Sequence, residues 1–408
     1  MDPRTLSIDD FDYRLPADSI ALHPLEERDA SRILYKRDGG YGEGLYRNLP
    51  ALLPADSLLV FNDTQVIEAR LLFRKESGGV VEVFLLEPCE GDVATALQSR
   101  GPVEWNCLVG GASKWKPGWQ PQAEVETHAG RIRLQAEMRA KGPEGFRIRF
   151  QWNPADLEFG ALLRHAGRMP LPPYLHREPE EADRERYQTV FARHAGSVAA
   201  PTAGLPFTER VLQGLEERGI RRAFVTLHVG AGTFRPVKAE RMDGHDMHTE
   251  YMEVSAAAIE ALRDHAGPVH AVGTTALRTL ESLYWMGAKV SAQPATPIGS
   301  LRLSQWEPYD APAGGMERDA ALDALLGWLR RHGRETLVAR TALIIAPGYR
   351  FRIAGGLVTN FHQPRSTLLL LVAAIVGDEW REMYAHALAS GFRFLSYGDG
   401  CLLEMREQ

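Results

Sequence analysis

The chain has 408 residues, of which 44% are hydrophobic and 25% are charged, and its formal net charge is −6. This composition is typical of a globular protein and excludes an intrinsically disordered chain. The negative balance also excludes binding of nucleic acid by overall charge alone, while leaving room for a local basic face. The length allows two or three domains with a substantial core.

The three cysteines are widely spaced, at Cys89, Cys107 and Cys401. Such a pattern provides neither a disulfide framework nor a four-thiolate zinc site. The first residues lack a basic-then-apolar secretory pattern, and the longest apolar run, residues 367–376, is shorter than the roughly 20 residues that span a bilayer. We therefore expect a cytoplasmic protein with no membrane segment.

The residue pattern of the chain changes near residue 70. Residues 1–70 are rich in turn formers and end in a clear strand at 57–62, whereas short β-favouring runs at 80–86, 103–109, 131–134 and 146–150 alternate with glycine and proline turns. This pattern predicts a small antiparallel barrel or sandwich. A helix should follow it, with Asn153 as N-cap and Pro154 as the first helical residue. Residues 178–186 carry dense charge of mixed sign, which favours a solvated face or a linker.

Strands and helices alternate from about residue 201 onward. The expected strands are 223–229, 269–273, 342–346, 357–359 and 392–395, and the expected helices are 208–218, 255–265, 276–286, 317–331 and 366–376. Alternation of this kind predicts an α/β fold with a mainly parallel sheet covered by helices on both faces. Ligands of such sheets bind outside the carboxyl ends of the strands. Five polar loops, at 226–237, 245–250, 273–278, 360–366 and 396–399, fall there.

The loop at 226–237 places His228 and two glycines, Gly230 and Gly232, directly behind an apolar strand. A lone histidine there is usually structural, but the glycines and Thr233 form a backbone surface that suits an anion or a sugar. Neither a P-loop lysine nor a complete dinucleotide fingerprint is present. In the next loop, His248 and its neighbours lack the order of zinc hydrolases, so acid–base chemistry or substrate contact ranks above surface decoration and metal binding.

Two further loops open helices. At residues 273–278 the first N–H groups of a helix suit a carboxylate or phosphate, with Thr274 and Thr275 as caps and Arg278 close by. Residues 360–367 repeat this design, where His362 and Arg365 are candidates for catalysis or for holding a phosphate. Asp399 fits an Asx-turn as well as it fits a ligand.

Motifs in order along the chain resemble the S-adenosylmethionine:tRNA ribosyltransferase-isomerase family of queuosine biosynthesis. They lie at residues 11–16, 23–24, 28–29, 59–64, 170–174, 185–190, 199–205, 226–234, 273–282, 347–349, 359–368 and 396–399. The resemblance implies an α/β domain made of residues 1–70 and 153–408, with a small antiparallel β-barrel domain inserted at 71–152. It also implies a monomer without a metal or prosthetic group.

The implied reaction transfers the ribosyl part of S-adenosylmethionine to 7-aminomethyl-7-deazaguanine at the tRNA wobble position and isomerises it, giving epoxyqueuosine with release of adenine and methionine. Such a reaction needs a base near the sulfonium, for which His228, His248 and Glu250 are candidates. Arg278 or the turn before it would hold the methionine carboxylate. The remaining expected binding residues are Asn62, Asp63, Thr64, Thr202, Gly230, Gly232, Thr233, Phe234, Thr274, Thr275, Asn360, His362, Arg365, Ser366, Tyr397 and Asp399.

Three positions depart from the family pattern in ways that bear on activity. Pro206 stands in place of a histidine, Gln65 in place of an arginine, and Asp246 in place of a lysine. The last two changes remove positive charge that phosphate binding would use. The alternative is therefore a divergent, non-catalytic paralogue that binds S-adenosylmethionine or RNA, or an enzyme with a different acceptor.

Overall fold

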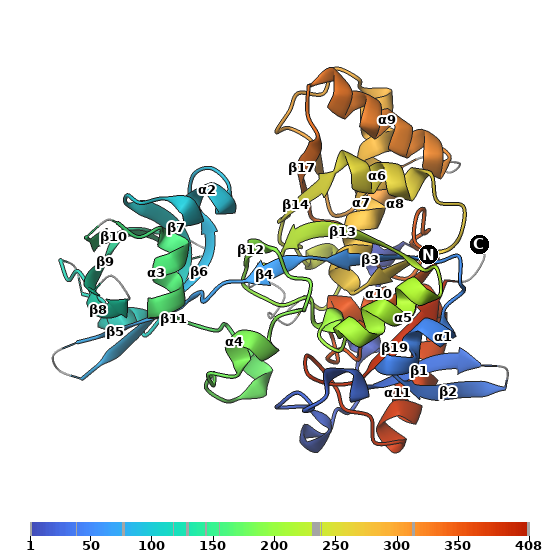
Figure 1. Ribbon diagram of the computed structural model, residues 1–408, viewed down its shortest axis with the longest axis horizontal. Coiled ribbons are helices and arrows are strands. Elements are labelled where there is room, and N and C mark those ends of the chain that lie inside the picture. Colours follow the sequence, from blue (N-terminus) through green and yellow to red (C-terminus); the bar gives the residue numbers. More distant parts are fainter. Residues whose placement is uncertain are drawn as a thin grey trace.

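The computed structural model contains a ten-stranded sheet whose central strands run parallel (Figure 1). It describes residues 2–37, 39–75, 78–116, 118–127, 130–142, 145–154, 156–230, 237, 239–311 and 315–405. The parallel centre, in order across the sheet, is β13 (Arg221–His228), β3 (Leu58–Asn62), β15 (Val269–Val272) and β18 (Gly356–Asn360). The flanks contain antiparallel pairs and consist of β14 (Glu250–Ser255), β17 (Thr336–Thr341) and β16 (Arg302–Leu303) on one side, and β19 (Gly400–Glu404), β1 (Arg32–Arg37) and β2 (Gly40–Leu45) on the other.

Helices cover both faces of this sheet, as the alternating pattern predicts. Strand β3 shows why, since its side chains alternate between two buried layers. Leu58 and Val60 pack in one layer, and Leu59 and Phe61 pack in the other. The first layer includes α6 (Ala256–Arg263), α7 (Thr274–Ala292), α9 (Arg318–Arg331), α10 (Thr367–Val376) and α11 (Trp380–Ala389), and the second includes α1 (Leu49–Leu52) and α5 (Glu209–Glu217). The short α8 (Glu307–Asp310) lies beside the first layer.

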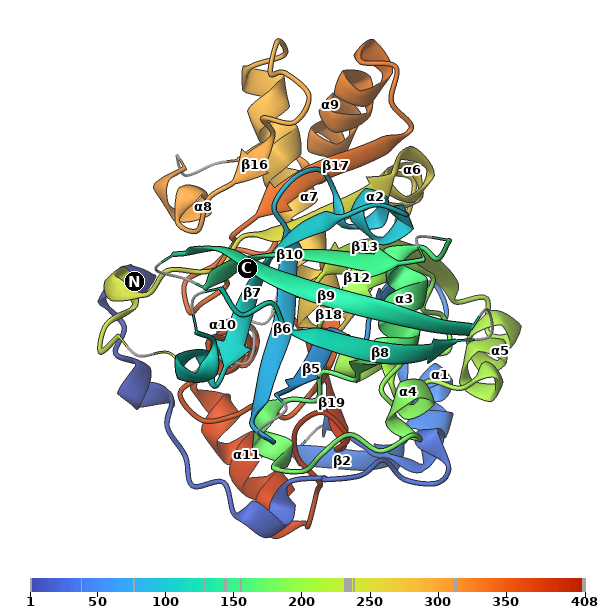
Figure 2. The same ribbon diagram turned by 90° about the vertical axis from the view of Figure 1, so that its left-hand side faces the viewer.

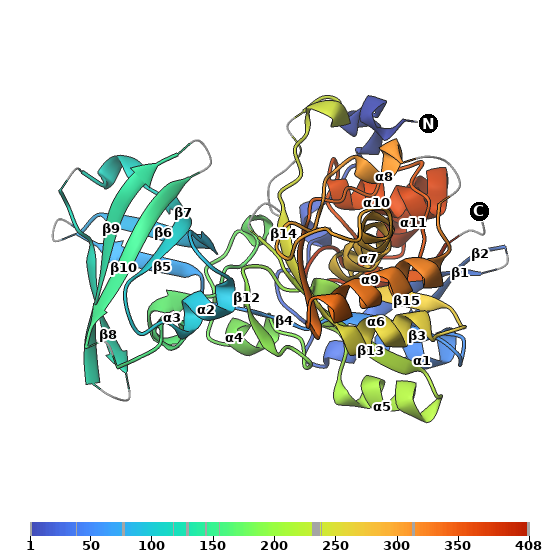
Figure 3. The same ribbon diagram turned by 90° about the horizontal axis from the view of Figure 1, so that it is seen from above.

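A second, seven-stranded sheet stands apart from the first (Figures 1 and 3). Every neighbouring pair in it is antiparallel, and it curls so that its edge strand β8 comes into contact with β5. The antiparallel part of the prediction is confirmed. The order is β11 (Gly167–Arg168), β5 (Arg70–Arg74), β6 (Val80–Pro88), β7 (Val103–Gly110), β10 (Phe146–Asn153), β9 (Gly130–Lys141) and β8 (Gln122–Thr127).

We refer to this sheet together with α2 (Val93–Gln98) and α3 (Phe159–Ala166) as the small lobe, residues 70–168. It packs around its own apolar core and sits in front of the larger sheet in Figure 2. A two-stranded parallel ladder of β4 (Thr64–Val66) and β12 (His194–Ser197) lies between the small lobe and the larger sheet, with α4 (Asp183–Arg186) beside it (Figure 3). None of the described helices is both long and apolar enough to cross a bilayer.

The helix predicted from Asn153 begins later than expected. Asn153 is the last residue of β10 and pairs with Arg133 of β9, so the ladder holds it in extended conformation. Helix α3 instead starts at Phe159, after Glu158. The composition of the segment predicted a helix correctly, but the sequence alone did not show that the preceding strand extends through its expected cap.

The predictions of two short strands near the C-terminus, at 342–346 and 392–395, are wrong. Residues 342–346 form no ladder, because the hydroxyl of Tyr309 bonds the Ile344 carbonyl at 3.1 Å and accepts from the Ala346 N–H at 3.0 Å. Residues 392–395 contribute only an isolated bridge, between Phe394 and Ile20. In both segments other groups satisfy backbone hydrogen bonds that a strand would use.

Candidate functional site

A first cavity of about 190 Å³ opens where the carboxyl ends of β15 and β18 meet the amino ends of α7 and α10. This is the position at which sheets of this type bind ligands. Loops that are far apart in the sequence come together around it. Its predicted site residues are Thr202, Gly230, His248, Glu250, Thr274, Thr275, Arg278, Asn360, His362, Arg365 and Ser366.

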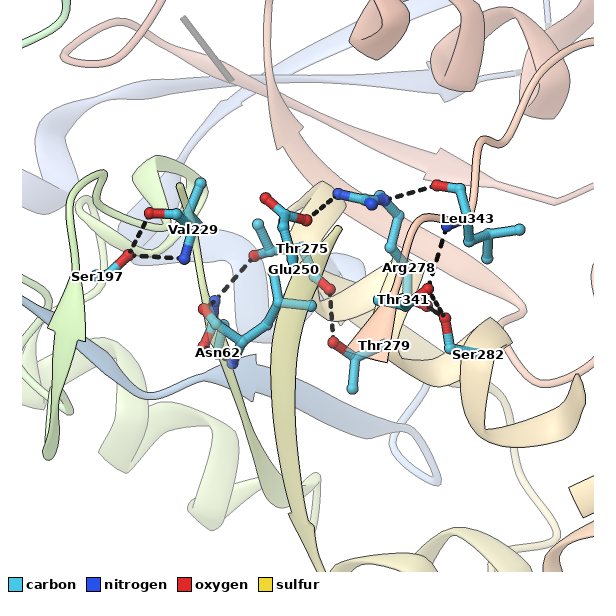
Figure 4. A network of polar contacts seen from close by, with 11 residues as sticks. Asn62, Ser197, Val229, Glu250, Thr275, Arg278, Thr279, Ser282, Thr341 and Leu343 are labelled. Atoms are coloured by element: carbon cyan, nitrogen blue, oxygen red, sulfur yellow. Dashed lines mark hydrogen bonds and ion pairs between the residues drawn. The ribbon is translucent and has the colours of Figure 1, made fainter. Parts of the chain in front are cut away.

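An ion pair between Glu250 and Arg278 is buried in the wall of this cavity (Figure 4). Arg278 Nη1 donates to a carboxylate oxygen of Glu250, and Arg278 Nε donates to the Leu343 carbonyl at 2.9 Å. The remaining nitrogen, Nη2, is buried and has no hydrogen-bond partner among the residues that the structure describes. Because a buried N–H without a partner is costly, this nitrogen is a ready donor for an acidic group of a ligand.

The amino end of α7 opens onto the same cavity without a side-chain cap. Its N-cap is Gly273, with a φ of 91° that glycine adopts without strain. The prediction that the threonines cap this helix is wrong, since Thr275 Oγ1 instead accepts from Asn62 Nδ2 at 3.2 Å. The first N–H groups of α7 therefore stay available to an anion, close to the guanidinium of Arg278.

The α10 side of the first cavity offers neutral polar groups. His362 Nε2 lies 3.0 Å from Thr359 Oγ1, and burial lowers the pKa of His362 to about 3, so its ring is uncharged at neutral pH. Thr202 Oγ1 donates to Asn360 Oδ1 at 2.8 Å. Arg365 is half exposed, and its guanidinium forms an ion pair with Asp9 at 2.8 Å. The α7 side of the cavity therefore offers better groups for binding an anion than the α10 side does.

A second cavity, of about 430 Å³, lies between the small lobe and the larger sheet. Residues 86–88 and 91–93 of the small lobe line it on one side, and His228, Tyr251 and Arg340 line it on the other. The two cavities share residues 229–230 and 247–250 in their linings. Two ligands that occupied them would consequently meet at this shared wall.

His228 belongs to the second cavity. Its Nδ1 lies 2.9 Å from Thr64 Oγ1, and its ring stacks on Tyr251 with centroids 6.2 Å apart and an interplanar angle of 13°. Burial, followed by the nearby His194, lowers the pKa of His228 to about 4. The ring is therefore neutral at neutral pH, and its Nε2 has no hydrogen-bond partner within the described part of the chain.

The three residues that the sequence grouped as candidate bases all line the second cavity, but they reach it from different parts of the sheet. In the β13–β14 ladder His228 lies opposite Tyr251, whereas Glu250 shares the orientation of Met252, which packs in the core. Since side chains alternate along a strand, His228 and Glu250 leave the sheet on opposite faces. His248 lies at the wall shared by both cavities.

Other predicted binding residues have their polar atoms engaged within the protein. Asp63 Oδ1 accepts from the Thr226 hydroxyl at 2.7 Å, Tyr397 donates to Asp183 at 2.8 Å, and Asp399 accepts from two backbone N–H groups. Gly232, Thr233 and Phe234 lie outside the described residues. The described predicted residues that line neither cavity are Asn62, Asp63, Thr64, Tyr397 and Asp399.

The three departures from the family pattern are not gathered at one place. Pro206 lines a separate small pocket that includes Tyr397, and it contacts neither the cavity of His228 nor that of Arg278. Gln65 is exposed on β4. Asp246 lines the second cavity. The Pro206 substitution therefore removes no proton-transfer group from either of the two larger cavities.

Comparison with known proteins matches residues 8–403 to the model of the family described as queuosine biosynthesis protein. A protein from Anaeromyxobacter sp. (strain Fw109-5) is 42% identical over 403 residues, covering 98% of this chain and 99% of the relative. One from Xanthomonas euvesicatoria pv. vesicatoria is 42% identical over 400 residues, covering 97% and 96%. Both are named S-adenosylmethionine:tRNA ribosyltransferase-isomerase. The chain belongs to the queuosine biosynthesis protein family.

A solved structure of S-adenosylmethionine tRNA ribosyltransferase from Thermotoga maritima is 28% identical to this family member, covering 96% of this chain and 99% of that one, with a TM-score of 0.45. A TM-score this low supports no detailed comparison of the folds.

Sequence reasoning about this family member missed several residues that shape the cavities. Tyr251 and Arg340 line the second cavity, and Gln305 fixes the shared wall by accepting from the Met247 N–H at 2.8 Å and donating to the His245 carbonyl at 2.8 Å. The alternation of Glu250 with Tyr251 in a β-strand is a signal that could have revealed the tyrosine. Arg340 and Gln305 carry no such signal, because their place depends on strand pairing.

Acidification should destabilise the protein through His228. Its folded-state pKa of about 4 lies below the ordinary 6.5, so the unfolded chain binds the proton first and stability falls as the pH drops below 6.5. We expect this residue to contribute about 2 kcal/mol of the loss in unfolding free energy between pH 7 and pH 5. Between pH 7 and pH 5, the unfolding free energy of His228→Gln, measured with urea, should fall by about 2 kcal/mol less than that of wild type. His23→Gln, at an exposed site, should match wild type, and equal slopes for all three proteins would contradict the prediction.

Proposed function

We propose that this chain transfers and isomerises the ribosyl part of S-adenosylmethionine onto 7-aminomethyl-7-deazaguanine at the tRNA wobble position, giving epoxyqueuosine and releasing adenine and methionine. The full-length family match and the names of the relatives support this activity. Two cavities with a shared wall also suit a transfer between two substrates, because the donor and the acceptor must touch.

S-adenosylmethionine binds in the first cavity, with its methionine carboxylate at the amino end of α7. The observation that carries this placement is the uncapped helix end beside the unpartnered Nη2 of Arg278 in one cavity wall. Helix N–H groups and a guanidinium together form a strong carboxylate site. Glu250 neutralises the rest of the guanidinium, so the pocket offers directed donors with little excess positive charge near the sulfonium.

His248 accepts the proton from the carbon beside sulfur. It lines both cavities, whereas Glu250 is already paired with Arg278 and His228 lines only the second cavity. A base must reach the donor where the donor meets the acceptor, and the shared wall is that place. The roles of Thr202, Asn360 and His362 are to orient the donor through neutral hydrogen bonds.

We further infer that the small lobe is an inserted domain, that the protein works as a monomer, and that the tRNA substrate places the reaction in the cytoplasm. S-adenosylmethionine is a consumed substrate, and the chemistry uses no prosthetic group. The described residues contain no group of three or more histidine, cysteine or carboxylate side chains positioned to hold a metal ion.

Purified protein should release adenine from S-adenosylmethionine only when tRNA carrying 7-aminomethyl-7-deazaguanine is present. Chromatography of the small molecules measures the adenine, and mass spectrometry of the digested tRNA identifies the epoxycyclopentane product. Unmodified tRNA with guanine at the wobble position is the matched control. Absence of adenine under conditions in which an authentic relative turns over would reject the proposed activity.

His248→Gln should lower the rate of adenine release by about a hundredfold or more, because a positioned base contributes at least that much. Affinity for S-adenosylmethionine, measured by calorimetry, should stay within about twofold of wild type. His386→Gln on α11 lines neither cavity and serves as the matched control. A wild-type rate in His248→Gln would remove this residue from the role of proton acceptor.

Arg278→Lys should weaken binding of S-adenosylmethionine by about tenfold, since the lysine keeps a cation beside Glu250 but loses the free Nη2 donor. Arg278→Ala is less informative, because it leaves a buried carboxylate without its partner. Calorimetry with decarboxylated S-adenosylmethionine sharpens the test. Wild type and Arg278→Lys should bind this ligand equally, and Arg334→Lys, at an exposed site, should behave as wild type with both ligands.

If Arg278→Lys weakens both ligands to the same extent, the arginine does not contact the carboxylate. In that case the amino end of α7 alone holds this group, or the donor is oriented differently in the cavity. The melting temperature of Arg278→Lys should stay close to that of wild type, which separates loss of binding from loss of folding.

A further inference from the structure

One face of the β13–β14–β17 ladder forms the floor of the second cavity. Strand register places His228 opposite Tyr251 and Tyr251 opposite Arg340, so their side chains leave the sheet on the same face. Two residues further along β14, Glu253 shares this face with them. The floor therefore combines an aromatic surface, a neutral imidazole and a guanidinium, with the carboxylate of Glu253 on the same face beside it.

One of three carboxylates from separate elements lines this cavity, and the other two lie close to it without lining it. Asp92, the N-cap of α2, lines the cavity from the small lobe, and Glu253 lies on β14. Asp63, just after β3, is buried and 3.6 Å from His194. Burial, together with the charges of Asp92 and Asp63, raises the pKa of Glu253. The charges of Asp92 and Asp63 thus disfavour ionisation of Glu253, and His194 offsets only part of this effect. A ligand cation between Asp92 and Glu253 would offset more of it.

His228 adds an independent sign that a ligand is expected here. Its side chain is more than nine-tenths buried and lines the cavity, and Thr64 engages only its Nδ1. Nε2 is left without a partner among the described residues. When the Thr64 hydroxyl donates to the His194 carbonyl, 3.4 Å away, Nδ1 carries the proton and Nε2 becomes an acceptor.

We infer that the second cavity binds a primary ammonium group carried on an aromatic base, with Asp92 and Glu253 attracting the cation and His228 Nε2 accepting a hydrogen bond from it. The inference rests on the proposed function, whose acceptor base carries an aminomethyl group. The flat ring of the base lies against Tyr251, and the amine then points toward the wall shared with the first cavity. A guanine without the aminomethyl group leaves the acids unpaired, which disfavours the wrong tRNA.

The test uses Asp92→Asn combined with Glu253→Gln, which removes both charges while keeping the shapes of the side chains. Asp92 accepts a hydrogen bond from the Thr95 N–H at 2.7 Å. Asparagine is also a good N-cap, so its side-chain oxygen can accept the same bond. The control is Asp378→Asn combined with Glu382→Gln, a matched pair of exposed acids that line neither cavity. Fluorescence anisotropy measures binding of two anticodon stem-loop RNAs, one with 7-aminomethyl-7-deazaguanine and one with guanine at the wobble position.

Wild type and the control should prefer the aminomethyl stem-loop by about tenfold or more, and the double variant should bind both RNAs about equally. Affinity for S-adenosylmethionine should be unchanged in the double variant. A preference that persists in the double variant, or a wild type without any preference, would overturn the inference. Adenine release by wild type reports separately on the proposed function: an inactive protein that keeps the charge-dependent preference contradicts the activity but not the ammonium site.

Discussion

The side-chain amide of Asn62 holds together the part of the sheet on which both cavities depend. Backbone pairing between β3 and β13 ends at Asn62 and Val225. Asn62 then continues the contact through its side chain, accepting from the Leu227 N–H and donating to the Leu227 carbonyl, both at 3.0 Å. Its other bonds reach the Thr64 N–H and the hydroxyl of Thr275. A single buried amide thus joins β3, β13, β4 and the start of α7. Figure 4 shows its contact with Thr275.

This junction explains why polar residues that line no cavity are still needed for the site. Beyond Asn62 the chain leaves the larger sheet for β4, and without the amide the end of β13 would lose its neighbour there. Ser197 supports the same end from the other side, accepting from the Val229 N–H at 3.0 Å. The two anchors fix residues 229–230 as a wall between the cavities. Donor and acceptor groups on either side can then meet at a defined distance.

Much of the architecture could be predicted from local sequence. Strand β3 and helices α5 and α6 were expected from apolar periodicity, and in the structure Thr208 and Ser255 cap the two helices. The failures share a cause, since a short segment takes its conformation from distant partners. Asn153 is drawn into a ladder with β9, and Tyr309 bonds the backbone where a strand was expected.

The site was predictable as a set of loops but not as an arrangement. Arg278 was found because polar residues follow an apolar strand, and His248 and Glu250 because histidines and a carboxylate cluster in the sequence; all three do line one cavity. The mutual pairing of Glu250 and Arg278 depends on how β14 is oriented relative to α7, which no local pattern specifies. That His228 and Glu250 leave opposite faces of the sheet depends on strand register in the same way. A one-residue difference in register would have reversed the faces.

The ladder between the small lobe and the larger sheet also holds His228 in position. Thr64 on β4 bonds the imidazole, and Gly196 on β12 lies so close that a Cβ there would be 2.8 Å from His228 Cε1. The imidazole is therefore held on one side by a hydroxyl and on another by bare backbone, and both come from the two strands that connect the lobes. Any side chain at position 196 would push against the ring, so the absence of a Cβ there is part of what sets the direction of His228 Nε2.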